Sequence, residues 1–152
     1  MTAILFVCLG NICRSPLTEG VFRHRAQAAG VAHRFEIDSA GCGGWHAGEP
    51  PDRRSIAVAA RYGTPIDEQC ARQVKPVDFD RFDLILGLDR DNVRRLTAMQ
   101  PAGSTAHVAL YLEEALGEMR DVPDPYYGDT RDFEAVYRLC ERASDALLTK
   151  LV

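Results

Sequence analysis

The chain has 152 residues, of which 46% are hydrophobic and 26% are charged. This composition is typical of a folded globular protein, and the length predicts a single domain over 1–152. The formal net charge is −4, whereas general nucleic-acid binders are usually basic. We therefore expect no nucleic-acid partner, although this charge is compatible with a local positive pocket for an anionic group.

The cysteines and the N-terminal residues indicate the compartment. The five cysteines are an odd number and lack the spacings of a disulfide framework or a zinc knuckle. Reduced thiols and a cytoplasmic location are the expectation. The apolar run 3–9 is short and has no basic leader, so it predicts a first strand and not a signal peptide. No stretch is long enough to cross a membrane, and no membrane partner is expected.

The first part of the chain predicts a strand, a helix and a second strand. The continuous apolar run 3–7 is typical of a central parallel strand that is buried on both faces. Ser15 suits the N-cap of the following helix, Pro16 its first position, and Gly30 its end. The second strand is expected over 35–38.

The middle of the chain continues this alternation. The glycine- and proline-rich residues 39–51 predict a loop, and Asp52 can begin a helix that ends near Gly63. The apolar run 83–88 predicts a third strand. Asp89 then suits the N-cap of another helix.

The last third predicts a strand, a loop and a long helix. The strand is expected over 106–109 and the loop over 121–129. Apolar side chains then recur at three- and four-residue spacings, which indicates an amphipathic helix that docks on the sheet. These positions are Phe133, Val136, Tyr137, Cys140, Leu147, Leu148 and Leu151. The alternation of strands and helices implies an α/β fold with a doubly wound parallel sheet.

The most informative stretch is Cys-Leu-Gly-Asn-Ile-Cys-Arg-Ser over 8–15, because it joins the first strand to the first helix. Ligands of such folds bind beyond the carboxyl ends of the strands, where this loop lies. Its N–H groups can point inward toward an anion, and the helix N-terminus adds positive potential. That potential favours the nucleophilic thiolate of Cys8, and the Arg14 guanidinium matches two phosphate oxygens. An inert buried Cys8 with a surface Arg14 is the alternative.

Motifs along nearly the whole chain resemble those of the low-molecular-weight protein tyrosine phosphatase family. They are Cys-Leu-Gly-Asn-Ile-Cys-Arg-Ser-Pro (8–16), Asp-Ser-Ala-Gly (38–41), Gly-Trp-His (44–46) with Gly48, Ala-Arg-Gln (71–73) and Asp-Pro-Tyr-Tyr-Gly-Asp (124–129). The resemblance implies a single-domain, flavodoxin-like fold whose four-stranded parallel sheet is flanked by helices. It also implies a hydrolase that acts on phosphotyrosine proteins without a metal or another cofactor.

The resemblance implies a role for each residue of the chemistry. Cys8 is the expected nucleophile and forms a cysteinyl-phosphate, while Arg14 and the loop N–H groups hold the phosphate oxygens. Asp124 is the expected acid that protonates the leaving phenolate and then acts as base for water. Asp121 and Asp129 are nearby competitors that lack the motif position. The expected phosphate-binding residues are Leu9, Gly10, Asn11, Ile12, Cys13 and Arg14.

Three further residues of this loop have expected roles around the nucleophile. Ser15 is expected to hydrogen-bond the Cys8 sulfur, and its alternative role is that of a helix cap alone. Asn11 fits a left-handed backbone position, which asparagine tolerates better than most residues. The resemblance also implies that Cys13 forms a reversible protective disulfide with Cys8, and an inert core thiol is the alternative.

Aromatic residues are expected to form the walls of a pocket for a flat ring. They are Trp45, Tyr126 and Tyr127, and plain packing is their alternative role. Ile12 is the fourth expected residue of this substrate pocket. It favours the tyrosine-directed branch of the family, because in the related protein-arginine phosphatases this loop position resembles a threonine. His46 lies beside Trp45 and is a further candidate for the cleft.

Some positions depart from the family pattern or indicate no site. Gln69 stands where many relatives have a histidine that supports Asn11 and Ser15, so this support is expected to differ here. The charge-dense segment 89–95 is expected to be a solvated helix face. Three other histidines have no partners at the spacing of metal ligands: His24, His33 and His107.

Two other functions stay open. A thiol-based arsenate reductase shares this fold and loop, but it needs relay cysteines, for which only Cys42 and Cys70 are candidates. A phosphocarrier would keep the phosphoryl group on Cys8, and such a protein has no need of the acid Asp124. For a phosphatase, the expected partner is a phosphotyrosine-bearing protein. The candidates for this substrate are a tyrosine kinase, a polysaccharide-export regulator and a host protein. A monomer is expected.

Overall fold

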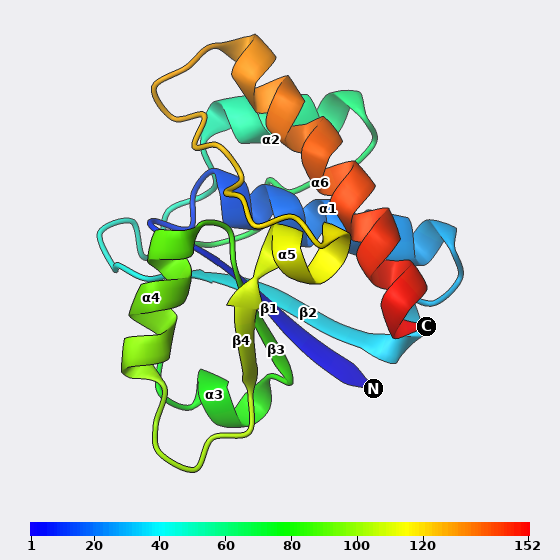
Figure 1. Cartoon of the computed structure of the whole chain (residues 1–152). Coiled ribbons are helices and arrows are strands. Elements are labelled where there is room, and N and C mark those ends of the chain that lie inside the picture. Colours follow the sequence, from blue (N-terminus) through cyan, green and yellow to red (C-terminus); the bar gives the residue numbers. More distant parts are fainter.

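The apolar N-terminal run forms the centre of a four-stranded sheet in the computed structural model, which describes residues 1–152 (Figure 1). β1 (Thr2–Cys8) pairs in parallel with β2 (Phe35–Gly41) on one side and with β3 (Leu84–Gly87) on the other. β4 (His107–Leu110) extends the sheet beyond β3, again in parallel. The strand order β2-β1-β3-β4 confirms the predicted doubly wound α/β fold.

Helices cover both faces of this sheet (Figure 1). One face carries α1 (Arg14–Ala28), α5 (Tyr111–Leu116) and α6 (Thr130–Leu151), with α2 (Arg53–Arg61) packed against α1 and α6. The other face carries α3 (Asp78–Arg81) and α4 (Arg90–Met99). A 3₁₀ turn over Ala32–Arg34 leads into β2. None of the helices combines the length and the apolar composition that crossing a membrane requires.

The alternation of side chains along β1 divides the core into two parts. Residues 4, 6 and 8 belong to the cluster with α1, α5 and α6, whereas residues 3, 5 and 7 belong to the cluster with α3 and α4. All of them are buried, which explains why this run is continuously apolar. The period of two also sets the direction of the candidate nucleophile, because it places the Cys8 side chain on the α1 face.

Three of the predicted helix ends are confirmed. The Asp52 side chain accepts from the Arg54 N–H at the start of α2. Asp89 and Asn92 form a reciprocal capping box at the start of α4. Gly30 follows the end of α1 with a φ of +72°, the left-handed conformation that glycine adopts without strain. Local signals in the sequence therefore identify these three helix ends.

The predicted N-cap at Ser15 is wrong. α1 already begins at Arg14, with Cys13 in the N-cap position, and no side chain caps it. Ser15 and Pro16 therefore lie inside the first turn. The first N-terminal N–H groups of α1 consequently lack a capping side chain, which leaves them available to another acceptor.

The structure also lengthens β2 and adds two short helices that were not predicted. Residues 39–41 stay in the sheet beyond the predicted strand 35–38, because they pair with the last residues of β1. The loop after β2 therefore begins at the same edge of the sheet as the loop after β1. α3 and α5 span 4 and 6 residues, which is too short for a helical pattern to be visible in the sequence.

Phe6→Ala should lower the free energy of unfolding by about 3–5 kcal/mol, because it leaves a cavity in the larger part of the core. Phe6 is fully buried, and its ring centroid lies 5.6 Å from that of Phe22 and 5.5 Å from that of Tyr111. Urea denaturation followed by circular dichroism measures the change. Val77→Ala is the control, since Val77 is 59% exposed and should change stability by less than about 0.5 kcal/mol. Equal effects of the two substitutions would contradict this assignment of the core.

Candidate active site

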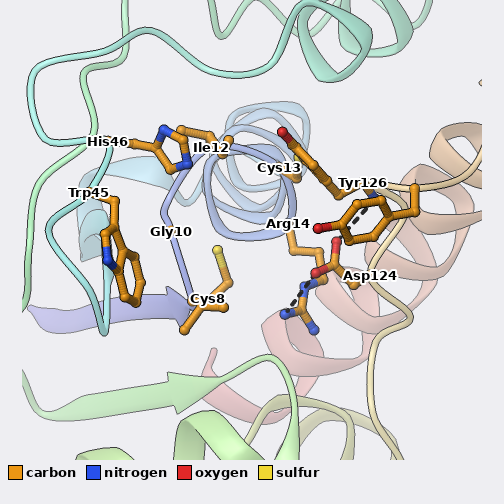
Figure 2. A pocket seen from close by; sticks show the side chains of 11 residues that line it. Cys8, Gly10, Ile12, Cys13, Arg14, Trp45, His46, Asp124 and Tyr126 are labelled. Atoms are coloured by element: carbon orange, nitrogen blue, oxygen red, sulfur yellow. Dashed lines mark hydrogen bonds and ion pairs between the residues drawn. The ribbon is translucent and has the colours of Figure 1, made fainter.

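The cradle loop, residues 9–13, lies between the end of β1 and the start of α1 (Figure 2). The chain passes from α1 to β2 on one side of β1, while β3 lies on the other side. This edge of the sheet is therefore its topological switch point, where open parallel sheets form a crevice for ligands.

The carbonyl groups around the cradle loop are held by hydrogen bonds to neighbouring segments. The carbonyls of Cys8 and Leu9 accept N–H donors from the loop after β2, at 2.9 Å each. The Ile12 carbonyl accepts from the Asp52 N–H at 2.7 Å, at the start of α2. These bonds fix the orientation of the peptide planes, so that the carbonyls are directed toward the surrounding segments.

The N–H groups of the cradle loop, in contrast, have no acceptor within the chain. None of residues 9–13 donates a backbone hydrogen bond. Most backbone N–H groups of a folded protein donate to the chain or to water, so successive groups with no acceptor in the chain mark a surface that is open to another acceptor. Successive free N–H groups beside a helix N-terminus form a concave set of donors. An anion with several oxygens fits this arrangement.

Asn11 holds the cradle loop in shape. Its φ is +58°, which confirms the predicted left-handed position. Its side-chain nitrogen donates to Ser15 Oγ at 2.8 Å and to Ser39 Oγ at 3.0 Å, and its side-chain oxygen accepts from the Arg72 N–H at 3.0 Å. Both N–H bonds and the oxygen of this buried amide are thus in use.

A chain of hydrogen bonds continues from Asn11 to a buried carboxylate. Ser39 Oγ donates to Glu19 Oε1 at 2.7 Å, and Glu19 Oε2 accepts from Arg23 Nη1 at 2.8 Å. Burial raises the pKa of Glu19, and the hydrogen bonds from Ser39 and Arg23 offset only part of this effect. Sequence reasoning missed Glu19 and Ser39, for which the only signal was the position of Ser39 in the Asp-Ser-Ala-Gly motif.

Ser15 contacts the sulfur of Cys8, as the sequence predicted. Ser15 Oγ lies 3.0 Å from Cys8 Sγ and 3.5 Å from the Ala40 carbonyl oxygen. Asn11 Nδ2 already donates to Ser15 Oγ, so the hydroxyl accepts one hydrogen bond there and keeps its own proton to donate to the Cys8 sulfur. Cys8 and Ser15 are both buried, so bulk water does not compete for the contact.

Arg14 presents one edge of its guanidinium to the site. Nη1 donates to Asp89 Oδ2 and to the Val122 carbonyl, both at 2.9 Å, which uses both of its protons. Nε and Nη2 donate no hydrogen bond to the chain, and together they form a free planar fork. Burial lowers the pKa of Arg14, but the negative charges of Cys8, Asp89 and Asp124 outweigh burial and raise the pKa above its ordinary value.

Asp89 is a site residue that sequence reasoning missed. Its Oδ1 caps α4 by accepting from the Asn92 N–H at 2.7 Å, while its Oδ2 holds Arg14. The predicted solvated face over 89–95 is correct for the exposed ion pairs along α4. It is wrong for Asp89, whose side chain is only 19% exposed. The available signal was its position after β3, because neighbouring parallel strands end at one edge of the sheet.

The loop between α5 and α6 brings Asp124 to the same pocket. Asp124 Oδ2 lies 3.8 Å from Arg14 Nη2, and 50% of the Asp124 side chain is exposed. Asp124 Oδ1 accepts from the Tyr126 N–H at 3.1 Å, a turn that orients the carboxyl group. The competing carboxylates lie elsewhere, since Asp121 binds the first residue of α4 and Asp129 caps α6.

These groups surround a pocket of about 250 Å³ (Figure 2). Its lining includes all four predicted substrate-pocket residues and the further candidate His46. The full lining is Cys8, Leu9, Gly10, Ile12, Cys13, Arg14, Trp45, His46, Asp124, Tyr126 and Tyr127. Figure 2 shows Trp45 and His46 on one side of the pocket and Asp124 and Tyr126 on the other. Tyr127 is 95% exposed and therefore contributes only to the rim.

The position of the Trp45 ring depends on a glycine. A Cβ atom at Gly43 would lie 1.8 Å from Trp45 Cζ3, so the indole ring occupies the space of a side chain at position 43. The opposite part of the indole remains accessible, and Trp45 is 68% exposed. One wall of the pocket is thus set by the absence of a side chain two residues earlier.

Arg54 connects the two sides of the pocket, and sequence reasoning did not single it out. Its Nε and Nη2 donate to the two Asp52 oxygens at 3.0 Å each, and its Nη1 reaches the Gly128 carbonyl at 3.4 Å. The guanidinium carbon lies 4.5 Å from the centroid of Phe133 and 5.5 Å from that of Tyr126. Because Asp52 is itself bonded to the cradle loop, Arg54 ties that loop to the α5–α6 loop.

Gln69 makes no hydrogen bond to Asn11 or Ser15. Its Nε2 donates to the Pro16 carbonyl at 3.0 Å, and its Oε1 is buried without a partner. The support that a histidine at this position is expected to give comes here from Ser39 and from the backbone of Arg72.

All five cysteines are free thiols. Burial and the negative charge of Asp52 raise the pKa of Cys13 to about 12, and burial raises the pKa of Cys42 and of Cys140 to about 11. Cys8 and Cys13 both line the pocket, and their redox pairing stays a prediction. No group of three or more His, Cys, Asp or Glu side chains is arranged to hold a metal ion.

Comparison with known sequences finds relatives over the whole chain. The family model described as low molecular weight phosphotyrosine protein phosphatase matches residues 3–152. The chain is 41% identical over 154 residues to the low molecular weight protein-tyrosine-phosphatase YfkJ of Bacillus subtilis, a match that covers 99% of this chain and 96% of that protein.

Solved structures of related sequences have the same fold. A protein tyrosine phosphatase from Entamoeba histolytica superimposes with a TM-score of 0.93 at 34% identity, covering 99% of this chain and 97% of the other. Wzb of Vibrio vulnificus, solved in complex with benzylphosphonate, superimposes with a TM-score of 0.85 at 28% identity and 99% coverage of both chains.

Alkylation by iodoacetamide at pH 7 should distinguish the thiols. We expect rapid labelling of Cys8, which lies open to the pocket, and of the exposed Cys70. Cys13, Cys42 and Cys140 should react slowly, because their raised pKa values keep them protonated at this pH. Mass spectrometry of proteolytic peptides measures each rate.

Inorganic phosphate provides the control for this experiment. It should slow the labelling of Cys8 and leave Cys70 unchanged, because only Cys8 lies under the free N–H groups. Labelling of Cys13 as fast as Cys8, or protection of Cys70 by phosphate, would contradict this description of the pocket.

Proposed function

The chain belongs to the low molecular weight phosphotyrosine protein phosphatase family and is a protein-tyrosine phosphatase, and from this premise we propose that it works through a phosphocysteine on Cys8. The observation that carries the proposal is the cradle loop. The N–H groups of residues 9–13 have no acceptor in the chain, and they adjoin Cys8 at the end of β1. A bound phosphate dianion supplies the missing acceptors.

In the first step, the Cys8 thiolate attacks phosphorus. A P–S bond forms, and the bond between phosphorus and the phenolic oxygen breaks. The remaining phosphoryl oxygens accept from the N–H groups of the cradle loop, and two of them match the free Nε and Nη2 of Arg14. Because Asp89 and Val122 already hold the guanidinium, these donors stabilise the transition state without reorganisation.

Asp124 supplies the proton that the leaving group needs. It protonates the phenolic oxygen in the first step and accepts a proton from the attacking water in the second. Its position across the pocket from Trp45 and beside Arg14 supports this role (Figure 2). In the second step, the P–S bond breaks as the Ser15 hydroxyl donates to the Cys8 sulfur, and inorganic phosphate leaves.

A flat aromatic ring is the leaving group that this pocket favours. Trp45 and Tyr126 stand on opposite sides of the pocket, and Ile12 lines it between them (Figure 2). Aromatic and branched apolar side chains bury a phenyl ring favourably. The relative Wzb was solved with benzylphosphonate, which joins such a ring to a phosphonate. The physiological substrate in this proposal is a phosphotyrosine-bearing protein, such as a tyrosine kinase, bound by a monomer.

Hydrolysis of p-nitrophenyl phosphate in the presence of EDTA tests the proposed chemistry. The wild-type protein should be active, because Arg14 and the cradle loop supply the positive charge. Cys8→Ser should abolish turnover, since a serine hydroxyl stays protonated at neutral pH. Asp124→Ala should lower kcat by about 10²–10⁴-fold through the loss of acid catalysis. Full activity in Cys8→Ser would overturn the mechanism.

A second substrate separates acid catalysis by Asp124 from a structural role. Asp124→Ala should slow the hydrolysis of phenyl phosphate more than that of p-nitrophenyl phosphate, because p-nitrophenolate leaves readily without a proton. Asp121→Ala is the control, since Asp121 lies on the same loop but binds α4. It should leave the ratio of the two rates unchanged. The measurement is kcat/KM, which reports the first step alone, because the second step hydrolyses the same phosphocysteine for both substrates. An equal loss of kcat/KM on both substrates in Asp124→Ala would contradict the acid role.

Arg54→Met should lower kcat for phenyl phosphate by about fivefold, because the α5–α6 loop loses its anchor at Gly128 and Tyr126. The same substitution in the Asp124→Ala protein should have little further effect if Arg54 acts by positioning Asp124. Arg61→Met is the control, an arginine on the same helix whose side chain is 51% exposed and pairs with Glu134. Equal losses in both backgrounds would show that Arg54 acts independently of Asp124.

A further inference from the structure

A second groove opens directly from the pocket. Its volume is about 490 Å³, and it shares Ile12, His46 and Tyr126 with the pocket as common walls. From there it runs over Pro50 and Pro51 to the first residues of α2. Figure 2 shows His46 and Tyr126 on either side of Ile12, so the groove leaves the pocket between these two side chains.

Each charged side chain in this groove has a hydrogen-bond partner except one. Glu49 Oε2 lies 2.9 Å from His46 Nδ1, and Asp52 holds Arg54 at 3.0 Å. Arg53 is exposed and takes part in no hydrogen bond or ion pair through its guanidinium. The groove therefore carries one guanidinium without a partner, while each of its carboxylates already has a hydrogen-bond partner.

We propose that this groove binds the residues next to phosphotyrosine in a substrate protein, and that Arg53 selects an acidic side chain among them. The inference rests on the proposed function of the pocket, because a phosphotyrosine held there places its neighbouring residues at the pocket mouth. A polypeptide is the occupant with the right form, since it is continuous with the ring in the pocket. An acidic side chain is the one that the free guanidinium attracts.

The floor of the groove is rigid, whereas the arginine arm is free. Pro50 and Pro51 restrict the backbone, and Asp52 is bonded both to the Ile12 carbonyl and to the Arg54 N–H. Arg53 is the first residue of α2 and therefore extends from a fixed base. Only the arm loses freedom when a carboxylate binds, which keeps the entropic cost of binding low.

The size of the effect follows from the exposure of Arg53. Exposed ion pairs change equilibrium constants by about two- to fivefold at moderate salt. We therefore expect a preference of this size for acidic over neutral flanking residues. The preference should fall at high salt, because screening shortens the range of exposed charges.

Phosphotyrosine peptides that differ only in their flanking residues test the proposal. One peptide carries alanine around the phosphotyrosine, and two others carry glutamate at the three positions before it or after it. The readout is the ratio of kcat/KM for acidic and neutral peptides. In the wild-type protein, glutamate on one side should raise this ratio to about 2–5. In Arg53→Ala the ratio should fall to about 1, and in Arg53→Glu it should invert.

Two variants control for effects that do not depend on the groove. Arg53→Lys keeps the charge and should keep most of the preference. Arg34→Ala removes another exposed arginine that lies before β2, at the opposite edge of the sheet, and should leave the ratio unchanged. A wild-type ratio of about 1 on both sides, or an unaltered ratio in Arg53→Glu, would overturn the proposal.

Binding to Cys8→Ser separates this proposal from the proposed chemistry. Fluorescence anisotropy of labelled peptides gives the Kd for acidic and neutral sequences without turnover. Loss of the acidic preference in Cys8→Ser carrying Arg53→Ala supports the groove even if the wild-type protein hydrolyses none of the peptides. Equal Kd values for the acidic and neutral peptides in Cys8→Ser, or no detectable binding of either, would overturn it.

Discussion

The structure depends on the hydrogen bonds that hold the carbonyls of the cradle loop. The carbonyls of Cys8 and Leu9 bond to the loop after β2, and that of Ile12 bonds to the start of α2. With its carbonyls used in this way, the loop keeps the N–H groups of residues 9–13 without partners. The folded chain thus keeps donors that have no acceptor in the chain next to a thiol, an arrangement that suits an oxyanion. The lengths of β1 and β2 and the start of α2 all serve this arrangement.

On the other side of the site, the Arg14 guanidinium is likewise held in place by hydrogen bonds to neighbouring segments. It is fixed by Asp89 after β3 and by the Val122 carbonyl in the α5–α6 loop, and it lies 3.8 Å from Asp124. One buried cation therefore joins the ends of two strands to the loop that carries the proposed acid. The proposed nucleophile and the proposed acid therefore take set positions relative to Arg14, the proposed phosphate clamp.

The sequence predicted those parts of the site that depend on local chemistry. The run before Cys8 indicated the central strand, and Asp52 and Asp89 were correctly identified as helix caps. Ser15 has the usual chemistry of an N-cap, but its tertiary contacts with Cys8 and Asn11 decide its role.

The contacts that escaped prediction join residues far apart in the chain. Arg14 and Asp89 are separated by 75 positions, and Arg54 and Gly128 by 74. No periodicity or spacing signals such a pair before the fold is known. The wall formed by Trp45 was predicted, whereas its dependence on Gly43 appears only in three dimensions. The indole fills the space above Gly43, and the N–H of the same glycine donates to the Leu9 carbonyl of the cradle loop. The residue that sets the aromatic wall therefore also helps to hold the anion-binding loop, so a change at this one position alters both the fit of a ring and the shape of the cradle.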